Sequence, residues 1–118
     1  MAADSEYAKA MAALGHDARL EVFRLLVQAG RNGLSVGEIG QHTGLAASTL
    51  AHHLRTLVGS GLILQQKSGR EVRNKVDYAK MQAVIDFLTS ECCQGVQVKQ
   101  RPLPPKGWPF PTSQPDNR

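Results

Sequence analysis

Apolar residues recur at helical spacing in two segments that lie far apart in the sequence. A stripe at positions i, i+3, i+4 and i+7 is typical of a helix with one buried face. One stripe is formed by Tyr7, Ala10, Met11 and Leu14, the other by Met81, Val84, Ile85 and Leu88. They predict a first helix that ends at Gly15 and a last helix from about Ala79 to Glu91.

The pattern between these stripes predicts three more helices. The first runs from Ala18 to about Gln28 with Asp17 as its N-cap residue. Its apolar face carries Leu20, Phe23 and Val27, widened by Val22, Leu25 and Leu26. We therefore expect this helix at the centre of the core, followed by a turn over Gly30 to Gly33.

The other two helices are short and close together. Ser35 and Glu38 fit a capping box at the start of the first, which Thr43-Gly44-Leu45 ends. The second runs from about Ala47 to Val58, with Leu50, Leu54 and Leu57 facing inward. Two helices joined by a glycine-containing turn form a helix-turn-helix unit.

A hairpin follows this unit. Leu62 to Lys67 and Val72 to Tyr78 flank the polar turn Ser68 to Glu71, and the second arm alternates with the period of a strand. The order of elements predicts a mainly α fold with a β-hairpin, a winged helix-turn-helix over residues 1–95. All six prolines fall within Arg101 to Arg118, so we expect residues 96–118 to form an extended or disordered tail.

Charge and composition narrow the function classes. The chain has 14 Lys and Arg against 10 Asp and Glu, a formal net charge of +4, which permits a polyanionic partner. It shows neither a secretory signal nor a stretch of about 20 apolar residues that a membrane helix needs, so we expect a cytoplasmic protein with no membrane partner. No catalytic motif has support in its spacing, and we expect no enzyme activity.

The predicted fold points to double-stranded DNA as the partner. In a helix-turn-helix, the N-terminal residues of the second helix meet base edges in the major groove. A basic hairpin beside it would contact phosphates or the minor groove. The candidate DNA-contacting residues are Ala47, Ser48, Thr49, His52, His53, Arg55, Arg70, Arg73 and Lys75.

Two alternatives stay open at this point. His53 precedes the inward-facing Leu54, so its ring is either a DNA contact or a packed structural side chain. The winged helix as a whole could bind another protein and not DNA. The first and last helices each carry an apolar stripe that a small domain cannot cover, which favours a homodimer through these helices.

The same residues resemble the arsenic-repressor (ArsR/SmtB) family of bacterial metalloregulators. The resemblance covers Met11 to about Leu88 and is carried by Leu14-Gly15-His16-Asp17-Ala18-Arg19-Leu20-Glu21-Val22-Phe23-Arg24-Leu25-Leu26, by Leu45 to Leu57, and by Gly61-Leu62-Ile63 with the turn Ser68 to Glu71. It implies a dimeric transcriptional repressor. The third helix lacks the cysteine pair of many arsenic- and cadmium-responsive members, and the last helix lacks the ligands of zinc-responsive members.

The adjacent Cys92 and Cys93 are the remaining soft ligands, predicted at the end of the last helix. They resemble the vicinal cysteines with which some family members sense trivalent arsenic or antimony, and soft ions prefer thiolate sulfur. The resemblance thus implies no permanently bound cofactor, and arsenite, an organoarsenical or antimonite as inducer. Redox or sulfide sensing through the same thiols is the alternative, although adjacent cysteines close a disulfide only under strain.

Overall fold

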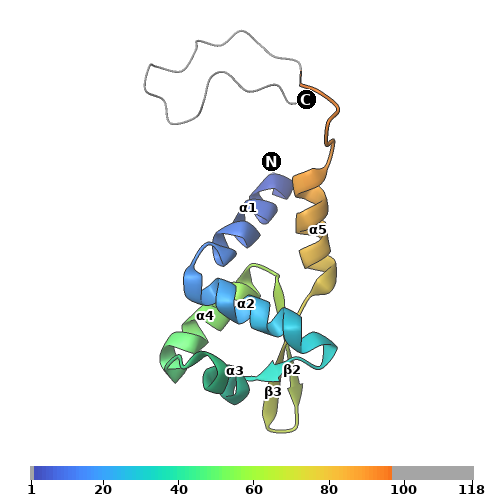
Figure 1. Ribbon diagram of the computed structural model, residues 1–118. Coiled ribbons are helices and arrows are strands. Elements are labelled where there is room, and N and C mark those ends of the chain that lie inside the picture. The colour runs from blue at the N-terminus through green and yellow to red at the C-terminus, as the bar shows by residue number, and fades with distance from the viewer. Residues whose placement is uncertain (1, 97–118) are drawn as a thin grey trace, which may run out of the picture.

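The computed structural model describes residues 2–96 of the chain, and these form five α-helices and a three-stranded antiparallel sheet (Figure 1). The elements are α1 (Ala2–Leu14), α2 (Asp17–Ala29), the 3₁₀ turn η1 (Gly30–Asn32), β1 (Leu34–Ser35), α3 (Val36–Thr43), α4 (Ala47–Gly59), β2 (Ile63–Ser68), β3 (Glu71–Val76) and α5 (Tyr78–Thr89). This order confirms the predicted winged helix-turn-helix. The expected proline-rich tail lies, from residue 97 on, outside the described residues.

The molecule has two ends, joined by α2. At one end α1 and α5 lie side by side (Figure 1). The rings of Tyr7 and Phe87 stack between them, with 4.2 Å between centroids. At the other end α3, α4 and the hairpin of β2 and β3 lie together. We call the helix-turn-helix and hairpin the head, and α1 with α5 the stem.

The core lies where α2 meets the head. Its fully buried side chains come from α1, α2, α3, α4 and the hairpin, so these elements pack around one centre. The inward Leu50, Leu54 and Leu57 of α4 are confirmed as buried. The largest buried apolar side chains are Val22, Leu26, Ile39, Leu50, Leu57, Leu62 and Ile63.

The predicted inner face of α2 is partly wrong. Val22, Phe23 and Leu26 are buried, whereas Leu20 and Val27 are 42% and 36% exposed in this chain. The helix is therefore rotated toward its Val22–Leu26 side. All six positions were apolar, so the pattern left the rotation of α2 undetermined.

Two helix starts show what side chains do for exposed backbone N–H groups. The capping box is confirmed: Ser35 Oγ accepts from the N–H of Glu38 at 3.2 Å, and Glu38 Oε1 accepts from the N–H of Ser35 at 2.8 Å. The prediction of Asp17 as the cap of α2 is wrong. His16 caps the helix, since its Nδ1 accepts from the N–H of Ala18 at 3.1 Å, and Asp17 occupies the first turn, where the helix dipole favours a carboxylate.

A short strand that the hydrophobic pattern did not predict completes the sheet. β1 pairs with β3, with Leu34 opposite Asn74 and Ser35 opposite Arg73, and the strand order is β1-β3-β2. Gly33, just before β1, has a positive φ of 64°, and a Cβ there would overlap the carbonyl oxygen of Asn74. Only glycine combines this backbone conformation with this close approach.

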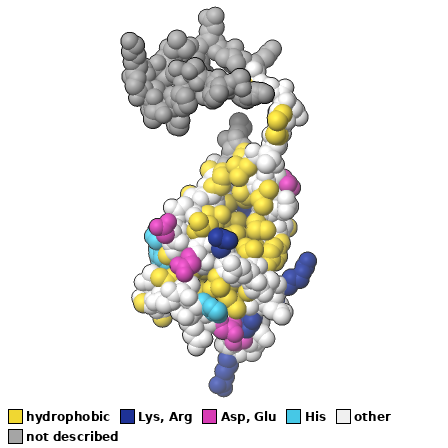
Figure 2. Space-filling view, viewed as in Figure 1, with side chains coloured by type: hydrophobic (Ala, Val, Ile, Leu, Met, Phe, Trp, Pro, Cys, Tyr) yellow, Lys and Arg dark blue, Asp and Glu magenta, His cyan; other side chains and the backbone are white. Residues whose placement is uncertain are grey.

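The stem leaves apolar surface uncovered. Val84 is buried and Met81 half-buried, but Ile85 and Leu88 are 45% and 59% exposed. Figure 2 shows hydrophobic side chains gathered on this face over α1, α2 and α5. Within residues 2–96, no helix combines the length and the apolar character needed to cross a membrane.

Candidate DNA interface and thiol pair

The helix α4 divides its residues cleanly between core and solvent. Ala47, Ser48, Thr49, His52 and Arg55 are all exposed, while the leucines point inward. Five of the six candidate contacts predicted on this helix are therefore accessible on the outer side of the head. Hydroxyl, imidazole and guanidinium groups at the start of such a helix can hydrogen-bond to base edges and phosphates.

The start of α4 has no side-chain cap. Its N-cap residue is Ala46, which makes no capping hydrogen bond. The first N–H groups of a helix lack intrahelical partners, and together with the positive end of the helix dipole they favour an anion. An uncapped helix start beside Ser48 and Thr49 is therefore suited to a DNA phosphate.

His53 lies on the inner side of α4. Its side chain is 6% exposed, and its Nδ1 has no hydrogen-bond partner in the described part of the chain. Its ring lies 4.8 Å from the ring of His16 and 5.7 Å from that of His52, measured between centroids. Of the two readings left open, this placement favours the packed histidine, because a buried ring does not reach a DNA groove.

The surroundings of His53 favour its neutral form. Burial lowers its pKa, and the positive charges of His16, Arg19 and His52 act in the same direction.

The hairpin, called the wing from here on, carries free cations at its tip. Arg70 and Lys67 are exposed, and Lys67 is a candidate that the sequence reasoning missed although it lies on the first arm. Lys75 is half-buried and donates from Nζ to Gln66 Oε1 at 2.6 Å. An open hollow of about 460 Å³ is lined by Lys67, Arg73 and Lys75 together with the carboxylate of Glu71.

Arg73, predicted as a DNA contact, is engaged within the protein. Its Nε and Nη2 donate to the carbonyl oxygens of Asn32 and Gly33 at 3.1 and 2.9 Å. Its Nη1 lies 3.4 Å from a carboxylate oxygen of Glu38 and 3.4 Å from one of Glu71. A local strand pattern could not show these contacts, because Asn32 and Gly33 are about forty residues away in the sequence.

The two thiols lie just beyond α5. The helix ends at Thr89, two residues earlier than predicted, so Cys92 and Cys93 lie in the following turn and not in the last helical turn. Both are free and exposed, with their Sγ atoms 3.1 Å apart. The turn puts Glu91 and Cys93 at positive φ angles of 58° and 64°, which is unusual for residues other than glycine and is a reason to ask for a function.

The short distance between the sulfur atoms suits an ion that binds both. The hydrogen bond with Cys93 raises the pKa of Cys92, and desolvation adds to this. Among residues 2–96, no group of three or more His, Cys, Asp or Glu side chains is arranged to hold a metal ion. From the described chain, the pair can supply two sulfur ligands.

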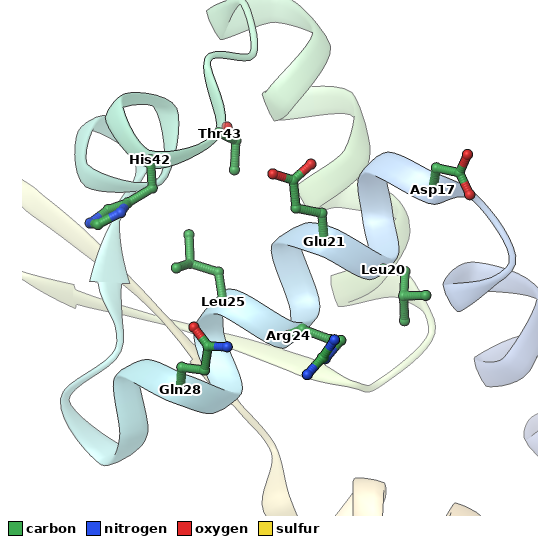
Figure 3. Close-up of a pocket in the computed structure, with 8 residues that line it drawn as sticks. All are labelled: Asp17, Leu20, Glu21, Arg24, Leu25, Gln28, His42 and Thr43. Atoms are coloured by element: carbon green, nitrogen blue, oxygen red, sulfur yellow. The ribbon is translucent and has the colours of Figure 1, made fainter.

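A separate pocket of about 400 Å³ lies between α2 and the end of α3. In Figure 3, Glu21 and Leu25 extend from α2 toward the side on which His42 and Thr43 lie. None of the candidate DNA contacts and neither cysteine lines it. The pocket is therefore distinct from both candidate sites.

The sequence of this chain is similar to a known domain family and to known regulators of transcription. A family profile described as "Helix-turn-helix domain" matches residues 14–66. The chain is 32% identical over 92 residues to the HTH-type transcriptional regulator YgaV of Escherichia coli, covering 77% of this chain and 91% of YgaV. It is 31% identical over 85 residues to the transcriptional activator HlyU of Vibrio cholerae, covering 72% of this chain and 76% of HlyU.

Solved structures agree with the sequence relatives. An ArsR-like transcriptional regulator from Rhodococcus superposes with a TM-score of 0.67 at 27% identity, covering 75% of this chain and 80% of that one. The homodimeric winged helix-turn-helix domain Mb0332 from Mycobacterium bovis, a possible ArsR-family regulator, gives a TM-score of 0.61 at 25% identity, with coverage of 76% and 83%. The relatives are regulators of transcription, and none of these names describes an enzyme.

Proposed function

Because the chain belongs to the ArsR/HlyU family of winged helix-turn-helix transcriptional regulators, we propose that it is a dimeric repressor whose release from DNA is controlled by Cys92 and Cys93. Two recognition helices, one from each copy, would read half-sites about one DNA turn apart. The single observation that carries the control by thiols is the pair of free, exposed sulfur atoms 3.1 Å apart beyond α5.

The DNA contact is proposed for the exposed side of α4 and the tip of the wing. Ser48, Thr49 and His52 would meet base edges, and Arg55, Arg70 and Lys75 would meet phosphates. Replacing Ser48 or His52 by alanine should abolish the preference for the upstream sequence and leave the oligomeric state unchanged. Replacing Arg70 should weaken binding to all duplexes and lower the salt slope of log K by about one.

The dimer is proposed to form through the stem. Ile85 and Leu88 present apolar area that the described chain leaves exposed, and the similar Mb0332 domain is homodimeric. Two-fold dimers are the commonest oligomers, and their interface pairs one patch with itself. A second copy of α1 and α5 would cover this area.

The inducer is proposed to be trivalent arsenic or antimony. Arsenous acid, As(OH)₃, can react with two thiols to form two As–S bonds, and two of its hydroxyl groups leave as water with the thiol protons. Methylarsenite, CH₃As(OH)₂, can react in the same way and then keeps no hydroxyl group. A two-thiol site therefore fits an organoarsenical fully and leaves one hydroxide on the inorganic ion.

A titration tests this proposal. The reduced protein is bound to a labelled duplex from its own upstream region, and arsenite, methylarsenite, antimonite or zinc is added while binding is followed by anisotropy. We expect release by the trivalent ions, with a coupling of about 1–3 kcal/mol between ion and DNA. Cys92→Ser and Cys93→Ser should bind DNA and fail to release it, whereas the neighbouring Ser90→Ala should respond like the wild type.

Two outcomes would reject parts of this account. Release of Cys92→Ser at wild-type inducer concentrations would exclude the thiol pair as the sensor. Equal affinity for the upstream duplex and a scrambled duplex would exclude the repressor function and favour a protein partner.

A thiol-redox regulator is the second candidate. The observation that favours it is again the 3.1 Å distance between the two free sulfur atoms, and a solved relative is named "Reduced HlyU". Closing the disulfide would need an oxidant to accept two electrons, with loss of the two thiol protons. Release by hydrogen peroxide, reversed by dithiothreitol and insensitive to arsenite, would support this candidate over the first.

A further inference from the structure

The wing and the first helix of the helix-turn-helix are joined through β3. Ser35 pairs with Arg73 across β1 and β3, and Ser35 is also the N-cap residue of α3. A strand of the wing thus lies directly beside the residue that starts α3.

The side chain of Arg73 adds a second connection at the same place. Its guanidinium donates to two carbonyl oxygens before β1 and faces Glu38 Oε1 at 3.4 Å. That carboxylate oxygen also accepts the N–H of Ser35 at 2.8 Å. The cap of α3 and the ion pair to the wing therefore share one oxygen atom.

The backbone around this connection has little freedom to shift. Asn74, fully buried, donates from Nδ2 to the carbonyl oxygen of Leu34 at 3.2 Å and accepts from Gln65 Nε2 at 2.8 Å. Gly33 lies so close to Asn74 that no side chain fits there. These contacts hold β1 against β3 independently of Arg73, so the ion pair adds orientation and not the pairing itself.

We infer that Arg73 and Glu38 are positioning residues, which set the wing relative to the helix-turn-helix so that the tip of the wing and α4 reach one duplex together. The inference rests on the proposed DNA contact of the wing. A direct phosphate contact by Arg73 fits the structure less well, because all three of its nitrogen groups face protein oxygens and its side chain is 25% exposed. Two carboxylates beside it would also repel a phosphate.

The variant Glu38→Gln separates the two roles. Glutamine serves as well as glutamate at this position of a capping box, so the start of α3 is retained and only the charge facing Arg73 is lost. Removing a negative charge from a DNA-binding surface ordinarily strengthens DNA binding. Positioning predicts the opposite, a loss of affinity of about three- to tenfold on a duplex long enough to meet the wing.

Glu71→Gln is the matched control. Glu71 also lies 3.4 Å from Arg73 Nη1, but it is on the same strand as Arg73, and within residues 2–96 it connects the wing to no other element. We expect its affinity to be equal to or higher than that of the wild type. Both variants should give the wild-type free energy of unfolding within the range of a surface substitution, which chemical denaturation would check.

Two further measurements distinguish positioning from a general loss of folded protein. On a short duplex that ends before the wing, Glu38→Gln should bind like the wild type. In an Arg70→Ala background its effect should shrink, because the wing has then lost its own contact.

Each outcome has a separate meaning. Equal losses of affinity on the long and the short duplex, or tighter binding by Glu38→Gln, would overturn the positioning role. The proposed function would still stand in that case, provided that the wild type prefers its upstream duplex to a scrambled one. A wild type that does not distinguish its upstream duplex from a scrambled one would reject the proposed function, and the positioning role with it.

Discussion

The head and the stem of this molecule differ in how far their large apolar side chains are buried within one copy. In the head, Leu50, Leu57 and Ile39 are fully or almost fully buried by other parts of the same chain. In the stem, Ile85 and Leu88 on α5 remain 45% and 59% exposed. The core of the head is therefore closed within one copy, whereas the stem leaves an apolar face that fits the proposed dimer.

This difference indicates that the head determines the stability of each copy and that the stem determines the proposed dimer. Substitutions in the head should change the unfolding of each copy, whatever the protein concentration. Substitutions on the exposed side of the stem should change the proposed dimer, and their effect should depend on concentration. The same kind of residue, leucine, occurs in both places and allows a direct test.

The largest effect is expected from Leu50→Ala. Its side chain is 1% exposed, and truncating a buried leucine costs about 2–5 kcal/mol. Denaturation at two protein concentrations should show the same loss at both. A loss below about 1 kcal/mol, within the range of surface substitutions, would mean that the head is packed differently.

The next largest effect is expected from Leu88→Glu on the dimer. A charge on the uncovered face of the stem should weaken association by about tenfold or more and leave the monomer folded. Leu64→Glu is the control, because Leu64 is similarly exposed at 53% but lies on β2 in the head. Sedimentation equilibrium would measure both, and equal dimer constants would exclude the stem as the interface.

A smaller effect is expected from removing the side-chain cap of α3 or adding one to α4, in two separate variants. Ser35→Ala removes the side-chain acceptor at the start of α3 and should lower the free energy of unfolding by about 1 kcal/mol. Ala46→Ser adds one where α4 has none and should raise it by a similar amount. Opposite signs in thermal denaturation would support the assignment, and equal signs would contradict it.

The smallest effect is a pH dependence from His53. Burial lowers its pKa in the folded protein, so the unfolded chain binds more protons as the pH falls through the ordinary histidine value of about 6.5. Stability from this group is fully present above that pH and declines below it. His53→Leu should flatten this decline in denaturation curves between pH 5 and 8, while the exposed His52→Leu should keep it.

The sequence predicted those parts of the fold that depend on residues only a few positions apart. The capping box of Ser35 and Glu38 and the inward leucines of α4 follow from spacing within a few residues, and both are confirmed. The rotation of α2 and the strand β1 did not follow, because each is decided by packing against distant segments. The cap by His16 was missed because Asp17 is the more usual cap residue.

The candidate site divides in the same way. Sequence spacing placed Ser48, Thr49 and His52 on one outer face of α4, where the structure exposes them. The hydrogen bonds from Arg73 to the carbonyl oxygens of Asn32 and Gly33 span forty or more positions and have no signature in a strand pattern. The thiol pair was evident from its adjacency, but the distance between the sulfur atoms depends on a turn that no propensity would predict, with two side-chain-bearing residues at positive φ.

Gly33 has a consequence for how this protein tolerates change. Its φ angle and its distance from the Asn74 carbonyl exclude every residue that carries a Cβ. In a library randomised at this position and selected for folded protein, glycine alone should survive, whereas Gly59, whose surroundings are open, should accept many residues. The lack of a side chain at position 33 thus limits which substitutions the head can tolerate.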